Sequence, residues 1–163
     1  MTIALAVGLL AHQAVSPPAA DAKTWYSPAR AACANRVAKM RCYHNRTRVL
    51  RHLERVHRDI RLQRSAQLKA MRIGRCGQPR HRPCGDSWLR PFRQAGYLPA
   101  PGRWLVGENL AWGFDSAWRA FAALMSSPAH RANILDPRFA DIGIDRRLSR
   151  WGVLWVIHYG RRR

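Results

Sequence analysis

The order of the periodic segments is the feature that most constrains the fold of this chain. Apolar side chains recur at helical three- and four-residue steps in the first half, clearly over residues 49–60 and again over 62–76. Segments typical of strands come late: residues 104–106 are short and apolar, and residues 152–159 are rich in Val, Ile, Trp and Tyr. Leading helices followed by strands indicate an α+β fold and not alternating βαβ units. A length of 163 residues is typical of one domain.

Further helices and strands are expected before and between these segments. Ser27 and Pro28 read as an N-cap and a first-turn proline, which favours a helix over residues 28–40. Gly77 is expected to stop the helix over 62–76. Asp86 or Ser87 would cap a short helix, and Asp115 or Ser116 a further one. Residues 140–144 are a candidate strand.

Residues 49–60 carry a helical pattern with many arginines. The apolar residues that recur at three- and four-residue steps are Val49, Leu50, Leu53, Val56 and Ile60. The arginines on or beside this segment are Arg46, Arg48, Arg51, Arg55 and Arg58. The pattern predicts an amphipathic helix with a basic face. That face would be solvated, or it would lie on an anionic surface.

The charge balance restricts the partners of the chain. There are 29 Lys and Arg residues against 9 Asp and Glu residues, a formal net charge of +20. Such a field attracts polyanions, which include nucleic acid, anionic lipid headgroups and acidic envelope polymers. Charge alone does not choose among these classes of partner.

The N-terminus has the layout of a secretory signal peptide. Residues 3–11 are an apolar run, and Ala20-Asp21-Ala22 is a small-x-small site that predicts cleavage before Lys23. The first residues carry no Lys or Arg, which departs from the usual layout. The run is too short for a spanning helix, so no transmembrane segment is expected in the mature chain. Export to the envelope or the outside makes nucleic-acid binding incidental.

Four cysteines agree with export, because an even count in an exported chain indicates two disulfides. Cys76 and Cys84 flank a turn-rich stretch that a disulfide could close. Cys33 and Cys42 would then pair by elimination. On one unbroken helix they would lie about 13 Å apart, too far for a disulfide. Either the helix breaks between them or the pairing differs; a zinc site is less favoured without a C-x-x-C pair.

Three sequence phrases carry a family resemblance: RHRPCG at residues 80–85, GENLAWG at 107–113 and SPAHRANIL at 127–135. In this order and spacing they resemble the bacterial branch of the CAP superfamily, which holds the cysteine-rich secretory proteins, antigen 5 and the plant pathogenesis-related proteins. The resemblance covers about residues 62–160. Residues 23–60 match loosely, and the first family helix is expected within them.

The resemblance implies an α-β-α sandwich with a central antiparallel sheet, preceded by an extra helical segment. The implied division is a signal peptide over 1–22, a basic helical segment over 23–60 and a CAP domain over 61–163. It also implies a ligand cleft built from His81, Glu108 and His130. Here His81 and His130 would be ligands of a divalent metal such as zinc, with Glu108 nearby.

Two departures from the family pattern weaken that metal site. The family often has a second glutamate on the helix before His130, and residues 115–126 contain none. The family's Thr-Gln pair on the last strand is replaced by Ile157-His158.

The predicted site residues can also be interpreted from their chemistry alone, without the family resemblance. Glu54 and Glu108 are the only glutamates in the chain, and a buried carboxylate is costly unless it is paired. Pro128 places His130 in the first turn of a helix, where the dipole disfavours imidazolium. The alternative is that His81, Glu108 and His130 form a structural hydrogen-bond cluster. The remaining histidines of interest are interpreted as surface or packing residues: His44, His52, His57 and His158.

Two functions follow. The first is a secreted binding module that acts at the cell envelope or outside the cell, with anionic envelope polymers or lipid headgroups as partners. The alternative is a metal-assisted hydrolase of peptide or cell-wall substrates. No catalytic residue is assigned. Ser126 and Ser127 lie near His130, but the chain lacks a G-x-S-x-G elbow and a capping role explains a serine there.

Overall fold

The computed structural model describes residues 33–77, 79–98, 103–150 and 152–162. The predicted signal peptide, residues 1–22, lies outside these residues, as does the start of the helix expected over 28–40. No helix in the described ranges has both the length and the apolar character needed to cross a bilayer.

Two long helices precede most of the sheet. Helix α1 (Arg36–Val49) begins where the Asn35 side chain accepts a hydrogen bond from the N–H of Ala38. Helix α2 (Ile60–Cys76) is capped by Asp59, which accepts from two backbone N–H groups of the first turn. It ends at Gly77, whose φ of 64° is left-handed. The helix expected over 62–76 and its glycine stop are confirmed.

Four strands form one sheet in the order β1-β3-β4-β2. Strands β2 (Trp104–Trp112), β3 (Asp141–Ser149) and β4 (Gly152–Arg162) pair antiparallel along their lengths. The short β1 (His57–Arg58) joins β3 in parallel, so the sheet is mixed. The strands expected at 104–106, 140–144 and 152–159 are confirmed, and each extends further than its sequence pattern indicates.

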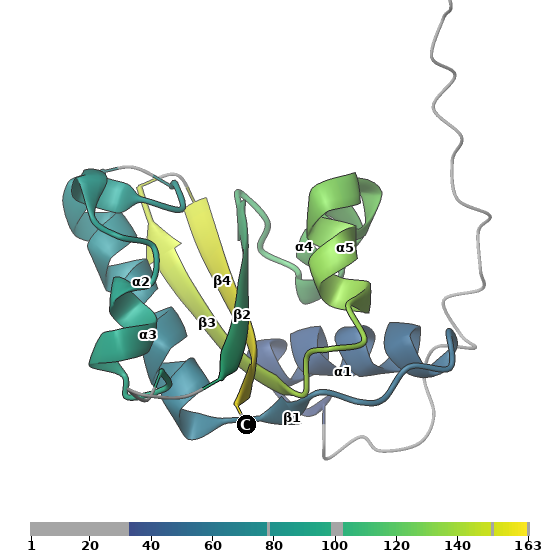
Figure 1. Cartoon of the computed structure of the whole chain (residues 1–163). Helices are drawn as coiled ribbons and strands as arrows, with labels where there is room; N and C mark the ends of the chain where they lie inside the picture. Colours follow the sequence, from purple (N-terminus) through teal and green to yellow (C-terminus); the bar gives the residue numbers. More distant parts are fainter. Residues whose placement is uncertain (1–32, 78, 99–102, 151, 163) are drawn as a thin grey trace, which may run out of the picture.

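Helices cover both faces of the sheet (Figure 1). Helix α2 and the short α3 (Arg90–Gln94) lie on one face, where the alanines of α2 meet β2 and β4. Helices α1, α4 (Ala117–Ser126) and α5 (Pro128–Leu135) lie on the other and form the larger core with Trp155 at its centre. This is the expected α+β sandwich.

The helix predicted over residues 49–60 is wrong. Helix α1 ends at Val49, and the chain turns at His52, which has a positive φ of 57°. Three of the five patterned apolar residues, Val49, Leu50 and Ile60, are exposed, and only Val56 is fully buried. The helical spacing of these five apolar residues therefore does not correspond to a shared buried face.

The basic face predicted for this segment is wrong at Arg48. Its side chain is completely buried, and its guanidinium donates to four backbone carbonyls. Helix α1 buries a stripe at helical spacing that is mostly polar: Met40, His44, Thr47 and Arg48. A hydrophobicity pattern does not detect such a stripe.

Both disulfides form. Cys76 at the end of α2 is bonded to Cys84 in the following loop. Cys33 is bonded to Cys42, with Cα atoms 6.2 Å apart. This pairing is possible because α1 begins only at Arg36, so the two cysteines do not share a helix.

Candidate functional site

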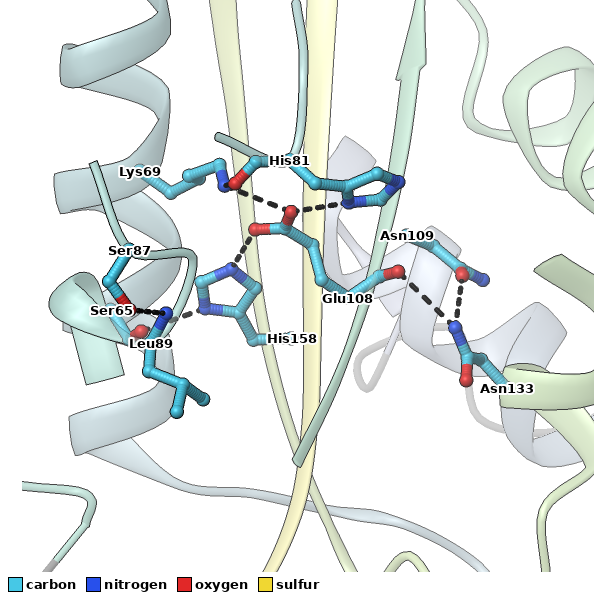
Figure 2. Close-up of polar contacts among 9 residues, drawn as sticks. All are labelled: Ser65, Lys69, His81, Ser87, Leu89, Glu108, Asn109, Asn133 and His158. Carbon is cyan, nitrogen blue, oxygen red and sulfur yellow. Dashed lines mark hydrogen bonds and ion pairs between the residues drawn. The ribbon is translucent and has the colours of Figure 1, made fainter. Parts of the chain in front are cut away.

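Glu108 lies at the centre of a polar cluster between β2 and α2 (Figure 2). Glu108 on β2 and His158 on β4 are directly paired across the sheet, so both side chains point to the same face. Ser65 and Lys69 are four residues apart on α2 and share the face of the helix that meets them. His81 comes from the loop that the Cys76–Cys84 disulfide closes.

Three side chains donate to the Glu108 carboxylate. Oε1 accepts from His81 Nδ1 at 2.7 Å and lies 3.0 Å from Lys69 Nζ. Oε2 accepts from His158 Nε2 at 2.8 Å. Because an ionised carboxylate only accepts, His81 carries its hydrogen on Nδ1 and His158 on Nε2. The other nitrogen of His158 then accepts from the Ser65 hydroxyl at 2.8 Å.

The donors keep Glu108 ionised despite its burial. Burial alone would raise the pKa of Glu108, but hydrogen bonds from His158 and His81, with the charge of Lys69, lower it to about 2. Burial lowers the pKa of Lys69 and of His158, while the Glu108 carboxylate opposes both shifts. The cluster is therefore built around a permanent buried anion.

Among the described side chains that contact the Glu108 carboxylate, only His81 is exposed to solvent. The side chains of Lys69 and Glu108 are each 1% exposed and that of His158 is 0% exposed, whereas the His81 side chain is 56% exposed. Glu108 holds the His81 ring by Nδ1, and Nε2 points away from the carboxylate (Figure 2). The result is an accessible imidazole that is held in one orientation by the buried carboxylate.

The His130 side chain forms no hydrogen bond with Glu108 among the described residues, but it is close enough to His81 for the two rings to interact electrostatically. The backbone carbonyl of His130 accepts from Asn109 Nδ2, and Asn133 donates both to the Glu108 carbonyl and to the Asn109 side chain. These bonds tie α5 to β2. Partial burial and then the nearby His81 lower the pKa of His130, so its imidazole is neutral at pH 7.

The three predicted cleft residues are thus only partly brought together. His81 and Glu108 are in direct contact, and His130 shares the neighbourhood of His81. Within residues 33–77, 79–98, 103–150 and 152–162, no three His, Cys, Asp or Glu side chains are grouped to hold one ion. The Glu108 carboxylate, which would have to be the third metal ligand, is already paired with Lys69.

Lys69, His158 and Ser65 are functional neighbours that the sequence analysis missed. His158 is no surface residue: it is fully buried, stacks on Phe92 and bonds to Glu108. A signal for Lys69 was present, since it lies among the apolar positions of α2 that are buried. A lysine there needs a buried anion, and Glu108 is one of only two glutamates available.

The chain of hydrogen bonds from Ser65 through His158 to Glu108 has the composition of a hydrolase triad. Both Ser65 and His158 are completely buried, so no substrate reaches that hydroxyl. The Ser126 hydroxyl donates to the Ala123 carbonyl. Ser127 stands at the N-cap position of α5, but its side chain makes no capping hydrogen bond there. The Ser65 hydroxyl is therefore not placed to act as an accessible nucleophile.

Comparison with known proteins agrees with this architecture. Residues 42–159 match the model of the CAP family, the cysteine-rich secretory protein family. An outer surface protein of Borrelia burgdorferi superimposes with a TM-score of 0.68 at 20% identity, covering 77% of this chain and 91% of that one. No curated protein matches the sequence.

Two longer bacterial structures share the fold. An extracellular protein of Bacillus anthracis that contains an SCP domain gives a TM-score of 0.65 at 18% identity. A cysteine-rich secretory protein of Staphylococcus aureus gives 0.61 at 15% identity. Each comparison covers 77% of this chain but only 40% and 38% of those proteins, respectively.

Proposed function

Because the chain belongs to the cysteine-rich secretory protein (CAP) family, we propose that it is an exported binding module acting at the cell envelope or outside the cell. Residues 1–22 would be its signal peptide, and His81 and His130 would contact its ligand. The observation that carries the proposal is the exposed His81 ring, held in one orientation by the buried Glu108 carboxylate.

Two features support the location. The two disulfides would persist in an oxidising compartment and not in a reducing cytosol. Two of the structural relatives are described as an outer surface protein and an extracellular protein. With a net charge of +20, anionic envelope polymers or lipid headgroups are the partners to expect, and nucleic-acid binding would be incidental.

The imidazoles of His81 and His130 suit a small polar ligand, or a divalent ion such as zinc that keeps water or ligand atoms in its other positions. Structural zinc sites use four protein ligands. A site with two would hold zinc weakly and exchange it readily. Metal-assisted hydrolysis, the alternative, has no further support in the described residues, because no group of three His, Cys, Asp or Glu side chains is placed there to complete a metal site.

Zinc is therefore the probe for an accessible imidazole pair. We expect the mature, disulfide-intact protein to bind one zinc ion in calorimetry, more weakly than a structural site with four protein ligands would. The His81→Ala, His130→Ala double variant should lose this binding. The exposed His57 lies on β1, away from the cluster, so His57→Ala is the matched control and should bind as the wild type does.

Two results would count against the proposal. Unchanged zinc binding in the double variant would place the ion elsewhere. Absence of binding in the wild type, combined with lower thermal stability of the double variant, would assign the cluster a purely structural role.

A further inference from the structure

A second hollow lies apart from the Glu108 cluster. It is a groove of about 870 Å³ between the first turns of α1, the side of α2 and strand β3. Figure 1 shows α2 running beside β3. Strand β3 pairs with β1 only at Asp141 and Ile142, so no described strand pairs with this edge beyond that point. Gln63 of α2 bonds both backbone groups of Ile144 there, which leaves a polar wall.

The groove is strongly basic. Its cationic lining residues come from three elements and are Arg36, Lys39, Arg41, Arg58 and Arg146. None of them forms an ion pair with a residue of the described ranges. The only acid in the lining, Asp145, lies 3.5 Å from Arg147, which is outside the lining. Among the described lining residues, five cations therefore stand against one acid, which is itself paired outside the lining.

We propose that this basic groove binds a linear anionic polymer of the cell envelope whose charge is carried by phosphodiester groups. The planar guanidinium group of arginine can donate two parallel hydrogen bonds to the oxygens of one phosphate group. Four of the five cations in the lining are arginines. The inference deepens the proposed function and rests on it for the location of the partner. It concerns a different surface from the imidazole pair, so the two are separable by experiment.

The shape and composition of the groove argue against a membrane surface. A bilayer is met by a flat or convex face from which apolar side chains project into the lipid. The exposed large apolar residues of the described chain are Val49, Leu50, Ile60, Met71, Trp104, Trp112, Trp118 and Leu148. None of them lines the groove.

The same lining argues against nucleic acid. Single-stranded nucleic acid is held by cations together with aromatic side chains on which bases stack. The groove contains no aromatic residue. A polyol phosphate chain needs only contacts to its phosphates, which the five cations provide.

The test uses a soluble poly(glycerol phosphate) oligomer and the purified mature protein, with affinity measured by calorimetry at about 0.15 M salt. The groove variant is Arg36→Gln, Lys39→Gln, Arg58→Gln. The matched control is Arg75→Gln, Arg93→Gln, Arg119→Gln, three exposed residues outside the groove. Both variants lower the net charge by the same amount. Circular dichroism and thermal melting confirm that each is folded.

We expect the groove variant to bind the oligomer at least tenfold more weakly, while the control stays within about threefold of the wild type. The slope of log K against log salt should fall by about 2 in the groove variant, as expected for three lost phosphate contacts to a single-stranded polyanion. Equal losses in the two variants would overturn the proposal, because binding would then follow net charge alone.

Three comparison ligands separate the sources of anionic groups. Vesicles of phosphatidylglycerol, a single-stranded oligonucleotide and polygalacturonate are matched in charge to the oligomer. If any of them binds more tightly than the oligomer and depends on the groove residues, the proposed partner is wrong. The His81→Ala, His130→Ala variant should bind the oligomer normally. Failure of the imidazole site and failure of the groove are therefore distinguishable.

Discussion

Arg48 is the residue that departs furthest from its expected role, and its contacts define what it does. Its Nε donates to the Glu54 carbonyl at 2.7 Å, and Nη1 donates to the carbonyls of Ile134 and Asp136 at 2.9 Å. Nη2 donates to the Phe139 carbonyl at 3.1 Å. One side chain therefore joins the end of α1, the loop after it and the segment between α5 and β3.

Replacing Arg48 should destabilise the protein severely. Arg48→Met fills similar space but leaves buried carbonyls without donors, at about 1–3 kcal/mol for each group left unpaired. We expect a loss of at least 3 kcal/mol in the free energy of unfolding, measured by urea denaturation. Arg48→Lys should lose nearly as much, because an ammonium cannot reach four carbonyls. The exposed Arg55→Met should change stability by under about 0.5 kcal/mol, and equal effects at both positions would contradict this account.

At the same scale, the sequence could place Glu108 and His81 together only through motif position. Nothing in the spacing of Lys69 and His158 identifies them as partners, since they come from α2 and β4 and meet only in the folded sheet. His130 was assigned to the same cleft, yet its backbone carbonyl, and not its imidazole, enters the hydrogen-bond network with β2. Such side-chain directions depend on tertiary packing, which a one-dimensional pattern does not record.

Among the elements, the contact between α2 and β3 is unusually close. Gly143 on β3 lies against the backbone of Leu62 in the first turn of α2, and a Cβ at Gly143 would fall within 2.1–2.3 Å of backbone atoms there. Backbone cannot move aside as a flexible side chain can. The glycine therefore permits α2 to lie directly on the sheet and to bring Lys69 within reach of Glu108.

Gly143→Ala should therefore separate α2 from β3. We expect a loss of about 3 kcal/mol or more, comparable with other severe packing errors. Gly74 on α2 is the matched control: a Cβ there meets nothing within 4 Å. Gly74→Ala should raise stability by up to about 1 kcal/mol, because alanine favours the helix. Thermal melting of both variants is the measurement, and a harmless Gly143→Ala would show that the two elements are not in the described contact.

The elements that sequence reasoning identified are those whose pattern matches their burial. Most residues buried by α2 and β4 are apolar, although Ser65, Lys69 and His158 are buried among them. Helix α1 was misplaced because its buried stripe includes His44, Thr47 and Arg48. The apolar residues that directly follow α1 in the sequence lie in a turn and an extended segment, not in a helix. A buried polar stripe is stable only when hydrogen-bonded, and its partners lie far away in sequence.

At the scale of the whole molecule, two buried polar groups from opposite faces of the sheet make folding depend on pH. His44, under α1, shares hydrogen bonds with the Met40 carbonyl and the Tyr159 hydroxyl. Burial lowers the pKa of His44 from 6.5 to about 4. On the other face, the pKa of Glu108 is lowered from 4.5 to about 2, where donor hydrogen bonds outweigh the opposing effect of burial. Both groups are favoured in their deprotonated forms by the folded state.

The sign of the dependence is the same for both groups, but the pH windows differ. A folded-state pKa below the unfolded value contributes stability that is complete above the unfolded pKa and is lost as the pH falls toward the folded pKa. For His44 this loss runs from pH 6.5 to about 4. For Glu108 it runs from pH 4.5 to about 2. Each shift corresponds to about 3 kcal/mol at most.

We therefore expect the free energy of unfolding to fall in two overlapping stages on acidification, measured by urea denaturation from pH 7 to pH 2.5. His44→Gln should flatten the stage between pH 6.5 and 4, leaving the part contributed by buried His158, whose pKa is also lowered. Glu108→Gln should be less stable at pH 7, because Lys69 and His158 lose their anion, and should flatten the stage below pH 4.5. Repulsion among the excess cations acts on wild type and variants alike, so parallel curves for all three proteins would assign acid unfolding to net charge and not to these two buried groups.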